Sequence, residues 1–247
     1  MTPTGILFDL DETLAQSKQP IAPDMAVLLT ALLTRVPVGI ISGSKYDILI
    51  QNVAEKLRSD TRYNLYLLPT CGASLHYWDG EMYRTVYEEL LTRAEEEEIQ
   101  RALHEAMAET GVIDLTVPSH GERIECRGCQ VTLSALGQVA PLEHKQAWDP
   151  DRVKRPILRD AIARRLPAFD VKTGGSTSID VTKPGINKAY GVRKFAEHLS
   201  LSIPDLLYIG DALFPGGNDE VVRETGIPVR ETTGPSMTAD IIREVLG

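Results

Sequence analysis

The feature that most limits the fold of this chain is the alternation of short, continuous apolar runs with segments of helical periodicity. Residues 5–8, 36–41 and 65–68 are predicted strands, and residues 24–34 and 45–57 are the predicted helices between them. Strands that are apolar throughout are expected where both faces of a parallel sheet are covered. The N-terminal part therefore predicts an α/β fold with helices packed on a parallel sheet.

The pattern changes near residue 83 and returns after residue 184. Between these points the sequence predicts two helices, residues 91–109 and 151–165, and five short strands, residues 113–117, 123–127, 130–134, 169–172 and 178–181. Helices beside hairpin-connected strands indicate an α+β domain. The α/β pattern resumes with helices at 187–198, 218–225 and 236–245 and a strand at 206–209. We expect residues 1–82 and 185–247 to form one domain, with residues 83–184 inserted as a second.

Composition and charge exclude some classes of function. The formal net charge of -9 argues against nucleic acid as a partner, because phosphate backbones are bound by basic faces. No apolar run reaches the roughly 18 residues of a membrane span, and the N-terminus lacks the features of a signal peptide. We therefore expect a cytoplasmic protein that binds neither nucleic acid nor membrane.

The three cysteines, Cys71, Cys126 and Cys129, form an odd set that suits a reducing compartment. Cys126 and Cys129 have the spacing of redox and zinc motifs, but no second pair completes a tetrahedral zinc site. We interpret them as incidental strand residues.

Acidic residues follow two of the predicted strands. Asp9 and Asp11 come directly after residues 5–8, where open α/β sheets place their ligands. Asp211 and Asp219 flank a glycine-rich loop after the strand at 206–209. Such crowding of like charges is unfavourable without a cation, and carboxylates with waters and a substrate phosphate suit Mg²⁺. The alternative for either pair alone is an ordinary turn, where Asp is common.

Four short motifs follow one another along the chain: Asp9-Leu-Asp11-Glu-Thr13, Ser42 after the run 38–41, Lys188, and Gly210-Asp211 with Asn218-Asp219. Together they resemble the motifs of the haloacid dehalogenase (HAD) superfamily of aspartate-nucleophile phosphotransferases. Taken singly, Lys188 is also typical of a surface helix and Ser42 of a helix cap. The order of the motifs favours the catalytic interpretation.

The resemblance implies a Rossmann-like parallel-sheet core with an inserted α+β cap of the C2B type. It implies that Asp9 attacks phosphorus to form an aspartyl phosphate and that Asp11 is the general acid and base. Ser42 and Lys188 would bind the transferring oxygens. The Mg²⁺ ligands implied are Asp9, Asp11 through its backbone carbonyl, Asp211, Asn218 and Asp219. Glu12 departs from the glycine usual in the family, and we expect its side chain to point to solvent.

Within the superfamily, the loop at 214–219, the segment 174–188 and the segment 124–138 resemble the eukaryotic-type phosphomannomutases. By position, Arg127, Ser178 and Asp180 match residues that hold the sugar and its distal phosphate in those mutases. Three further substrate-binding positions carry a different residue where the mutases have arginine: Lys18, Gln138 and Lys145. Lysine lacks the bidentate fork of arginine, and glutamine lacks its charge too. The basic helix around Arg155 is an alternative source of the missing cation.

These substitutions leave two principal hypotheses. The first is a Mg²⁺-dependent phosphatase of a small phosphorylated sugar, because a hydrolase needs only one phosphate site and a water. The second is a phosphomannomutase that tolerates the substitutions. A receiver-type signalling domain is a poorer reading, since it needs no inserted domain, and a catalytically silent binding protein fits badly with intact motifs. The resemblance also implies a homodimer formed through the cap.

Overall fold

A computed structural model describes residues 3–247 of the chain. The described chain forms two compact units, a larger one that ends its first part at Glu88 and resumes at Ile186, and a smaller one spanning Glu89–Gly185. The sequence placed the first boundary after residue 82. Six more residues belong to the larger unit because β5 (Tyr83–Glu88) pairs with β4 (Ser74–Trp78) in its sheet.

The sheet of the larger unit has the order β11-β10-β1-β2-β3-β4-β5 within the described residues. Its other strands are β1 (Gly5–Phe8), β2 (Val38–Ile41), β3 (Leu65–Leu68), β10 (Leu206–Gly210) and β11 (Val229–Glu231). These five run parallel, whereas β4 and β5 are antiparallel additions at one edge. The predicted α/β class is confirmed, and the hairpin at the edge was not foreseen.

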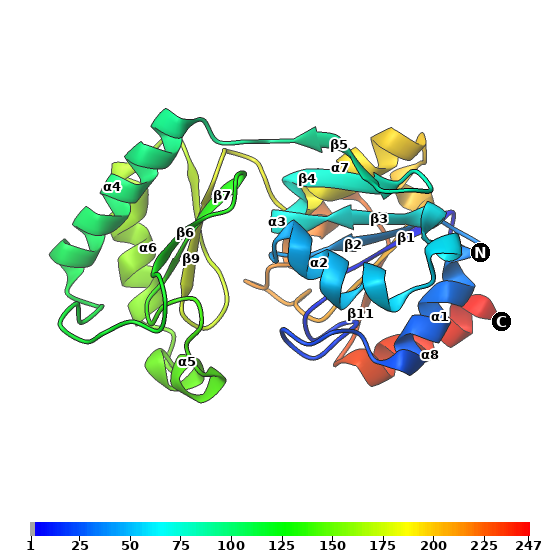
Figure 1. Ribbon diagram of the computed structural model, residues 1–247, viewed down its shortest axis with the longest axis horizontal. Coiled ribbons are helices and arrows are strands. Elements are labelled where there is room, and N and C mark those ends of the chain that lie inside the picture. Colours follow the sequence, from blue (N-terminus) through cyan, green and yellow to red (C-terminus); the bar gives the residue numbers. More distant parts are fainter. Residues whose placement is uncertain (1–2) are drawn as a thin grey trace. The chain divides into compact units, whose positions relative to one another are not determined.

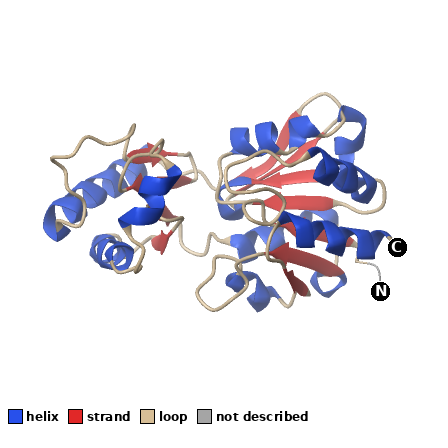
Figure 2. Ribbon diagram, turned by 90° about the horizontal axis from the view of Figure 1, so that it is seen from below, coloured by secondary structure: helices blue, strands red, loops and turns tan. Residues whose placement is uncertain are grey.

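Helices cover both faces of this sheet, which is why its strands are apolar throughout. They are α1 (Pro23–Leu33), α2 (Tyr46–Asn52), α3 (Pro69–Gly72), α7 (Lys188–Leu199) and α8 (Pro235–Leu246), with short 3-10 turns η1 (Ala54–Lys56), η2 (Ser59–Asn64), η3 (Ile203–Asp205) and η4 (Glu220–Thr225). Figures 1 and 2 show the helices on both sides of the sheet. Buried side chains of α1 and α8 belong to one cluster with Ile6 and Phe8, whereas those of α7 belong to another with Leu7. Among residues 3–247 no helix has both the length and the apolar character to cross a membrane.

The smaller unit is an α+β arrangement, as its sequence indicates. Its sheet has the order β6-β7-β9-β8, formed by β6 (Ile124–Cys126), β7 (Gln130–Ser134), β8 (Asp170–Thr173) and β9 (Ser178–Thr182). Two helices, α4 (Arg93–Thr110) and α6 (Lys154–Arg165), pack on one face of this sheet around Val131 and Ile179. The third helix, α5 (Leu142–Trp148), has no counterpart among the predicted elements.

Two predicted elements were wrong. Residues 113–117 form no strand, because the carboxylate of Asp114 accepts hydrogen bonds from the backbone N–H and the hydroxyl of Thr116 and closes a turn. The helix expected at 218–225 is the shorter 3-10 turn η4. In the first case, hydrogen bonds from nearby groups to a side chain formed a turn in place of the strand that the apolar pattern predicted. In the second case, the glycine-rich loop extends to residue 219, so the helical turn begins later than predicted.

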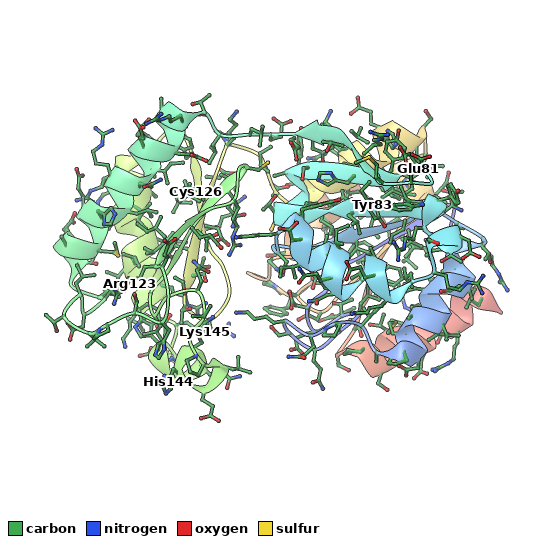
Figure 3. The ribbon with its side chains drawn as sticks, in the orientation of Figure 1. Glu81, Tyr83, Arg123, Cys126, His144 and Lys145 are labelled. Atoms are coloured by element: carbon green, nitrogen blue, oxygen red, sulfur yellow. The ribbon has the colours of Figure 1, made fainter. Side chains whose placement is uncertain are left out.

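The hydroxyl of Tyr83 is buried without a hydrogen-bond partner among the described residues (Figure 3). The hydroxyl of Tyr87, on the same strand, donates to the carbonyl of Gly72 at 2.7 Å. An unpaired buried polar group costs free energy, whereas a paired one contributes about 1 kcal/mol. We therefore expect Tyr83→Phe to leave the free energy of unfolding unchanged or raise it, and Tyr87→Phe to lower it by about 1 kcal/mol. Denaturant unfolding of both variants measures this, and a larger loss from Tyr83→Phe contradicts it.

His76 is a second buried polar group in this hairpin, with its ring nitrogens beside the hydroxyls of Ser74 and Thr85 at 3.0 and 3.1 Å. Burial lowers the pKa of His76 from 6.5 to about 4. Between these pH values the unfolded chain binds more protons than the folded one. The contribution of His76 to the free energy of unfolding is therefore fully present above pH 6.5 and is lost as the pH drops toward 4. Glu88, 4.0 Å from Nε2, favours the charged form and limits the effect.

We expect His76 to remove about 2 kcal/mol of stability between pH 7 and pH 4. The measurement is the free energy of unfolding against pH for the wild type and for His76→Gln, in which this part of the slope disappears. His104→Gln, which replaces an exposed histidine on α4, is the matched control for the loss of a histidine. Parallel curves for the wild type and His76→Gln would contradict the expectation.

Candidate active site

Three neighbouring strands of the larger sheet are each followed by a polar residue at their carboxyl ends. Asp9 follows β1, Ser42 follows β2 and Asp211 follows β10, and the sheet order sets β1 between the other two. Because these strands are parallel, their carboxyl ends meet. The tertiary structure thus brings together residues that are up to about 200 positions apart in the chain.

Asp9, Asp211 and Asp219 form an acidic cluster in which one oxygen from each lies within 4.8 Å of the others. Asp9 and Asp219 are almost fully buried. The hydroxyl of Thr13 lies 3.4 Å from Oδ1 of Asp211 and donates to it. Three carboxylates in such proximity repel one another unless positive charge is nearby.

Lys188 supplies positive charge inside this cluster. It is the first residue of α7, whose N-terminus is capped by the side chain of Asn187, and only 1% of Lys188 is exposed. Its Nζ lies 2.5 Å from Oδ1 of Asp9 and 2.5 Å from Oδ1 of Asp219. Lys188 is therefore no surface helix lysine but a buried cation held between two carboxylates.

The electrostatics of the cluster leave it short of positive charge. Burial raises the pKa of Asp9 to about 7, against the opposing effect of the Lys188 ammonium. Burial also raises the pKa of Asp211, and Asp219 adds to the shift. Burial alone would lower the pKa of Lys188, but Asp9 and its other neighbours raise it well above its usual value. When all three carboxylates are ionised, one ammonium leaves two negative charges, and the hard carboxylate oxygen atoms fit a divalent cation such as Mg²⁺.

The return of the chain to Asp219 depends on two glycines that leave no room for a side chain. A Cβ at position 217 would lie 2.0 Å from the carbonyl oxygen of Ala212, and a Cβ at position 210 would lie 2.4 Å from Oδ2 of Asp219. Glycine at both positions lets the loop fold back so that Asp219 returns to the end of β10. Asn218, which the sequence offered as a metal ligand, immediately precedes Asp219 in this loop.

Asp11 and Glu12 hold the loop that follows β1. Oδ1 of Asp11 accepts a hydrogen bond from the backbone N–H of Lys18 at 2.6 Å, and Oε1 of Glu12 accepts one from Ser17 at 2.9 Å. The backbone of Glu12 has φ 57°, in the left-handed region that favours glycine. This conformation explains why glycine is usual there, and the bond to Ser17 offsets part of the strain. Glu12 is exposed, as expected, yet it is engaged with its own loop.

Ser42 is buried at the end of β2. Its Oγ accepts a hydrogen bond from the backbone N–H of Ser44 at 3.1 Å. The N-cap residue of α2 is Lys45, so Ser42 does not cap that helix. Ser42 thus lies at the end of the strand next to β1.

The candidate residues Arg127, Ser178 and Asp180 all lie in the smaller unit. Asp180 accepts a hydrogen bond from the hydroxyl of Thr132 at 2.7 Å, and burial raises its pKa. Nε of Arg127 donates to Glu125 at 2.8 Å. Ser178 pairs with Ser134 across β7 and β9. Asp180 and Thr132 alternate with the apolar residues of their strands, so they share the sheet face opposite α4 and α6.

The two substituted positions of the smaller unit bond to backbone. Nζ of Lys145, on α5, donates to the carbonyl of Gln138 at 2.8 Å, and Lys145 is buried. The side-chain amide of Gln138 donates to the carbonyl of Arg123 at 3.4 Å. Figure 3 labels Arg123 and Lys145 in this part of the unit. Lys18, the third such position, has φ 62° and lies in the loop after β1.

Sequence reasoning missed one residue of the cluster, Tyr208. Its hydroxyl donates to Oδ1 of Asp219 at 2.6 Å. In the sequence, Tyr208 stands within the apolar run of β10 and reads as an ordinary core aromatic residue. Only the fold shows that its hydroxyl reaches the acidic cluster.

The fold, together with sequence similarity to phosphomannomutases, identifies the chain as an enzyme, a phosphotransferase of the HAD superfamily. Two solved structures share its fold: a haloacid dehalogenase-like hydrolase from Bacteroides thetaiotaomicron (TM-score 0.67, 16% identity, covering 98% of this chain and 99% of that one), and a Plasmodium falciparum IMP-nucleotidase (TM-score 0.71, 16% identity, 99% and 68%).

Sequence comparison identifies the family more closely. The sequence model of eukaryotic phosphomannomutase matches residues 25–247, so the chain belongs to that family. Phosphomannomutase 1 of Dictyostelium discoideum is 25% identical over 249 residues, covering 98% of this chain and 96% of that protein. The phosphomannomutase of Dendrobium officinale is 27% identical over 246 residues, with 95% and 91% covered.

Proposed function

We propose that the protein is a Mg²⁺-dependent phosphatase of a small sugar phosphate that works through an aspartyl phosphate. Hydrolysis is favoured over the mutase reaction by the hydrogen bonds at Gln138 and Lys145, two positions where the mutases have arginine. Gln138 is uncharged, and the ammonium of Lys145 donates to the carbonyl of Gln138. A mutase must hold a second phosphate, where arginine gives a bidentate fork, whereas hydrolysis needs one phosphate site and a water.

The residues of the larger unit have the chemistry for both halves of this reaction. An oxygen of Asp9 forms a bond to phosphorus while the bond from phosphorus to the ester oxygen breaks, and Asp11 gives its proton to that oxygen. Asp11 then takes a proton from the attacking water, whose oxygen joins phosphorus as the bond to Asp9 breaks. Inorganic phosphate leaves and Asp9 is regenerated. Lys188 and Ser42 stabilise the transferring oxygens.

Asp9, Asp211 and Asp219 are the side chains that we propose to hold Mg²⁺, with Asn218 and the backbone carbonyl of Asp11 as further ligands. Bound there, the cation neutralises charge on the nucleophile and on the phosphoryl group. The support is the two negative charges that remain after pairing with Lys188.

A phosphomannomutase is the second candidate, favoured by the match of the family model to residues 25–247. Arg127, Ser178 and Asp180 are retained at the positions that bind sugar and phosphate in that family. In this reading Lys18, Gln138 and Lys145 suffice for the distal phosphate.

Phosphorus NMR with mannose 1-phosphate and Mg²⁺, with and without a hexose bisphosphate, separates the two candidates. Inorganic phosphate as the product supports the phosphatase. Mannose 6-phosphate as the product overturns it in favour of the mutase. Asp9→Asn serves as the blank, and a panel of other sugar phosphates is tested in the same way.

We also propose that the protein forms a homodimer through its smaller unit. Six large apolar side chains there are more than half exposed, and Val117, Val139 and Leu142 are the most exposed of them. The backbone N–H of Val139 bonds to the carbonyl of His120, which brings these two segments together. Light scattering tests the proposal: a mass of one chain contradicts it, and Val139→Asp should dissociate the dimer.

A cytoplasmic location is proposed on the basis of the cysteines. The number of cysteines is odd, and no disulfide joins Cys71, Cys126 or Cys129 within residues 3–247, which suits a reducing compartment. Cell fractionation with an antibody to the protein tests this, and recovery in a secreted fraction contradicts it.

A further inference from the structure

Tyr208 is a buried polar residue that the reaction described above does not use. It lies on β10 with its ring in the apolar cluster beneath α7, near Val192 and Phe195, and it is 0% exposed. A phenylalanine would fill the same space. The hydroxyl therefore needs its own explanation, because enclosing a polar group in an apolar layer costs free energy unless it is paired.

The partner of this hydroxyl is Asp219, which receives three hydrogen bonds. Nζ of Lys188 and the hydroxyl of Tyr208 donate to Oδ1 at 2.5 and 2.6 Å, and the backbone N–H of Ala212 donates to Oδ2 at 3.1 Å. Donors on both oxygens fix the position of the carboxylate and its rotation. The atom that Tyr208 contacts is the one that contacts Lys188.

The same ammonium has Asp9 on its other side, with Nζ of Lys188 2.5 Å from Oδ1 of Asp9. A continuous chain of charged hydrogen bonds therefore runs from Tyr208 through Asp219 and Lys188 to Asp9. Small displacements in such a chain matter because phosphoryl transfer depends on the placement of the charges around the transferring group.

We propose that Tyr208 is a positioning residue for phosphoryl transfer: its hydroxyl orients Asp219, which holds the Lys188 ammonium against Asp9. This inference rests on the proposed function, and it applies equally to hydrolysis and to the mutase reaction. The hydroxyl of Tyr208 donates its proton to Asp219, so its hydrogen bond reaches Lys188 and Asp9 through that carboxylate.

The first test is the kinetics of Tyr208→Phe on a phosphate ester that the wild type turns over. We expect kcat to fall about tenfold and KM to change less than about threefold, because the lost donor bond is to a charged group and the residues proposed to hold the sugar are untouched. The control is Tyr83→Phe, which removes a buried hydroxyl from the same unit where that hydroxyl has no partner among the described residues. It should keep kcat within about twofold.

The second test does not depend on activity. In protein with ¹³C in the ε-methylene groups of lysine, the Lys188 signal is the one missing from Lys188→Arg. Tyr208→Phe should shift or broaden this signal, and Tyr83→Phe should leave it in place. A role for Tyr208 in packing alone would lower the unfolding midpoint without moving the Lys188 signal.

A double variant covers the case in which Tyr208→Phe does not fold. Removing both partners of a buried bond costs less than removing one, so Tyr208→Phe is compared within the Asp219→Ala background, which has no acceptor for the tyrosine hydroxyl. If Tyr208 acts through Asp219, it changes neither kcat nor the Lys188 signal further in that background. A further displacement of the signal there overturns the proposal.

The outcomes separate this inference from the proposed function. A kcat for Tyr208→Phe within about twofold of the wild type overturns the inference, while the wild-type activity upholds the function. If no phosphate ester shows turnover that depends on Asp9, the proposed function fails. The NMR signal of Lys188 is then the only test of the inference about Tyr208. An unchanged signal in Tyr208→Phe then overturns the inference, and a displaced signal supports it.

Discussion

Replacing Lys188 with methionine should lower the free energy of unfolding by about 3–5 kcal/mol at pH 8, because it leaves buried carboxylates without their counter-charge. Methionine keeps most of the volume of the lysine side chain, so the effect reports charge rather than a cavity. Both Asp9 and Asp219 contact the lost ammonium at 2.5 Å. Denaturant unfolding, analysed from the midpoint at constant slope, measures the change.

The loss should depend on pH in a definite direction. The ammonium opposes the rise in the pKa of Asp9, so its removal raises that pKa further above the value in the unfolded chain. The folded variant then binds more protons than its unfolded form, and its stability falls as the pH rises. The deficit relative to the wild type should be smaller at pH 6 than at pH 8.

Two comparisons control this experiment. Lys194→Met lies on the same helix and removes a surface pair with Glu197 and cation–π contacts with Tyr87 and Tyr190, which together contribute about 1–2 kcal/mol. Adding Asp9→Asn to Lys188→Met removes one unpaired carboxylate and should restore part of the stability. If Lys188→Met is as stable at pH 8 as Lys194→Met, the expectation is wrong. The buried pairs of Lys188 with Asp9 and Asp219 would then contribute no more to the free energy of unfolding than a surface pair.

Asp9→Asn should reduce kcat by about three to five orders of magnitude on any phosphate ester that the wild type turns over. The amide keeps the shape of the side chain but is no nucleophile, so the loss isolates the bond to phosphorus. Turnover of p-nitrophenyl phosphate with Mg²⁺ gives a continuous measurement, and circular dichroism shows that the variant is folded.

The control for this loss is Asp60→Asn, which changes an exposed carboxylate paired with Arg58 on η2. It should keep kcat within about twofold of the wild type. Full activity of Asp9→Asn would reject Asp9 as the nucleophile, and with it the aspartyl phosphate. Intermediate activity that vanishes after repurification would indicate a contaminating phosphatase.

Sequence reasoning worked best where a pattern is local. The apolar runs at 5–8, 65–68 and 206–209 are strands because parallel strands are covered on both faces. It failed where side chains bond to nearby backbone, as at Asp114, and at the sheet edge. There β4 and β5 mix polar and aromatic residues, because one face of an edge hairpin meets solvent.

The sequence by itself determined the α/β class, the presence of an α+β unit and the identity of the acidic residues, since periodicity and short motifs are properties of neighbouring residues. Only the tertiary structure decided which of those residues meet. Strand order placed Asp9 beside Asp211 and Asp219, and burial set the charge balance around Lys188. Tyr208 shows the difference most clearly: its residue type suits a core strand, and the role of its hydroxyl depends on a carboxylate 11 positions away that a glycine-rich loop folds back toward it.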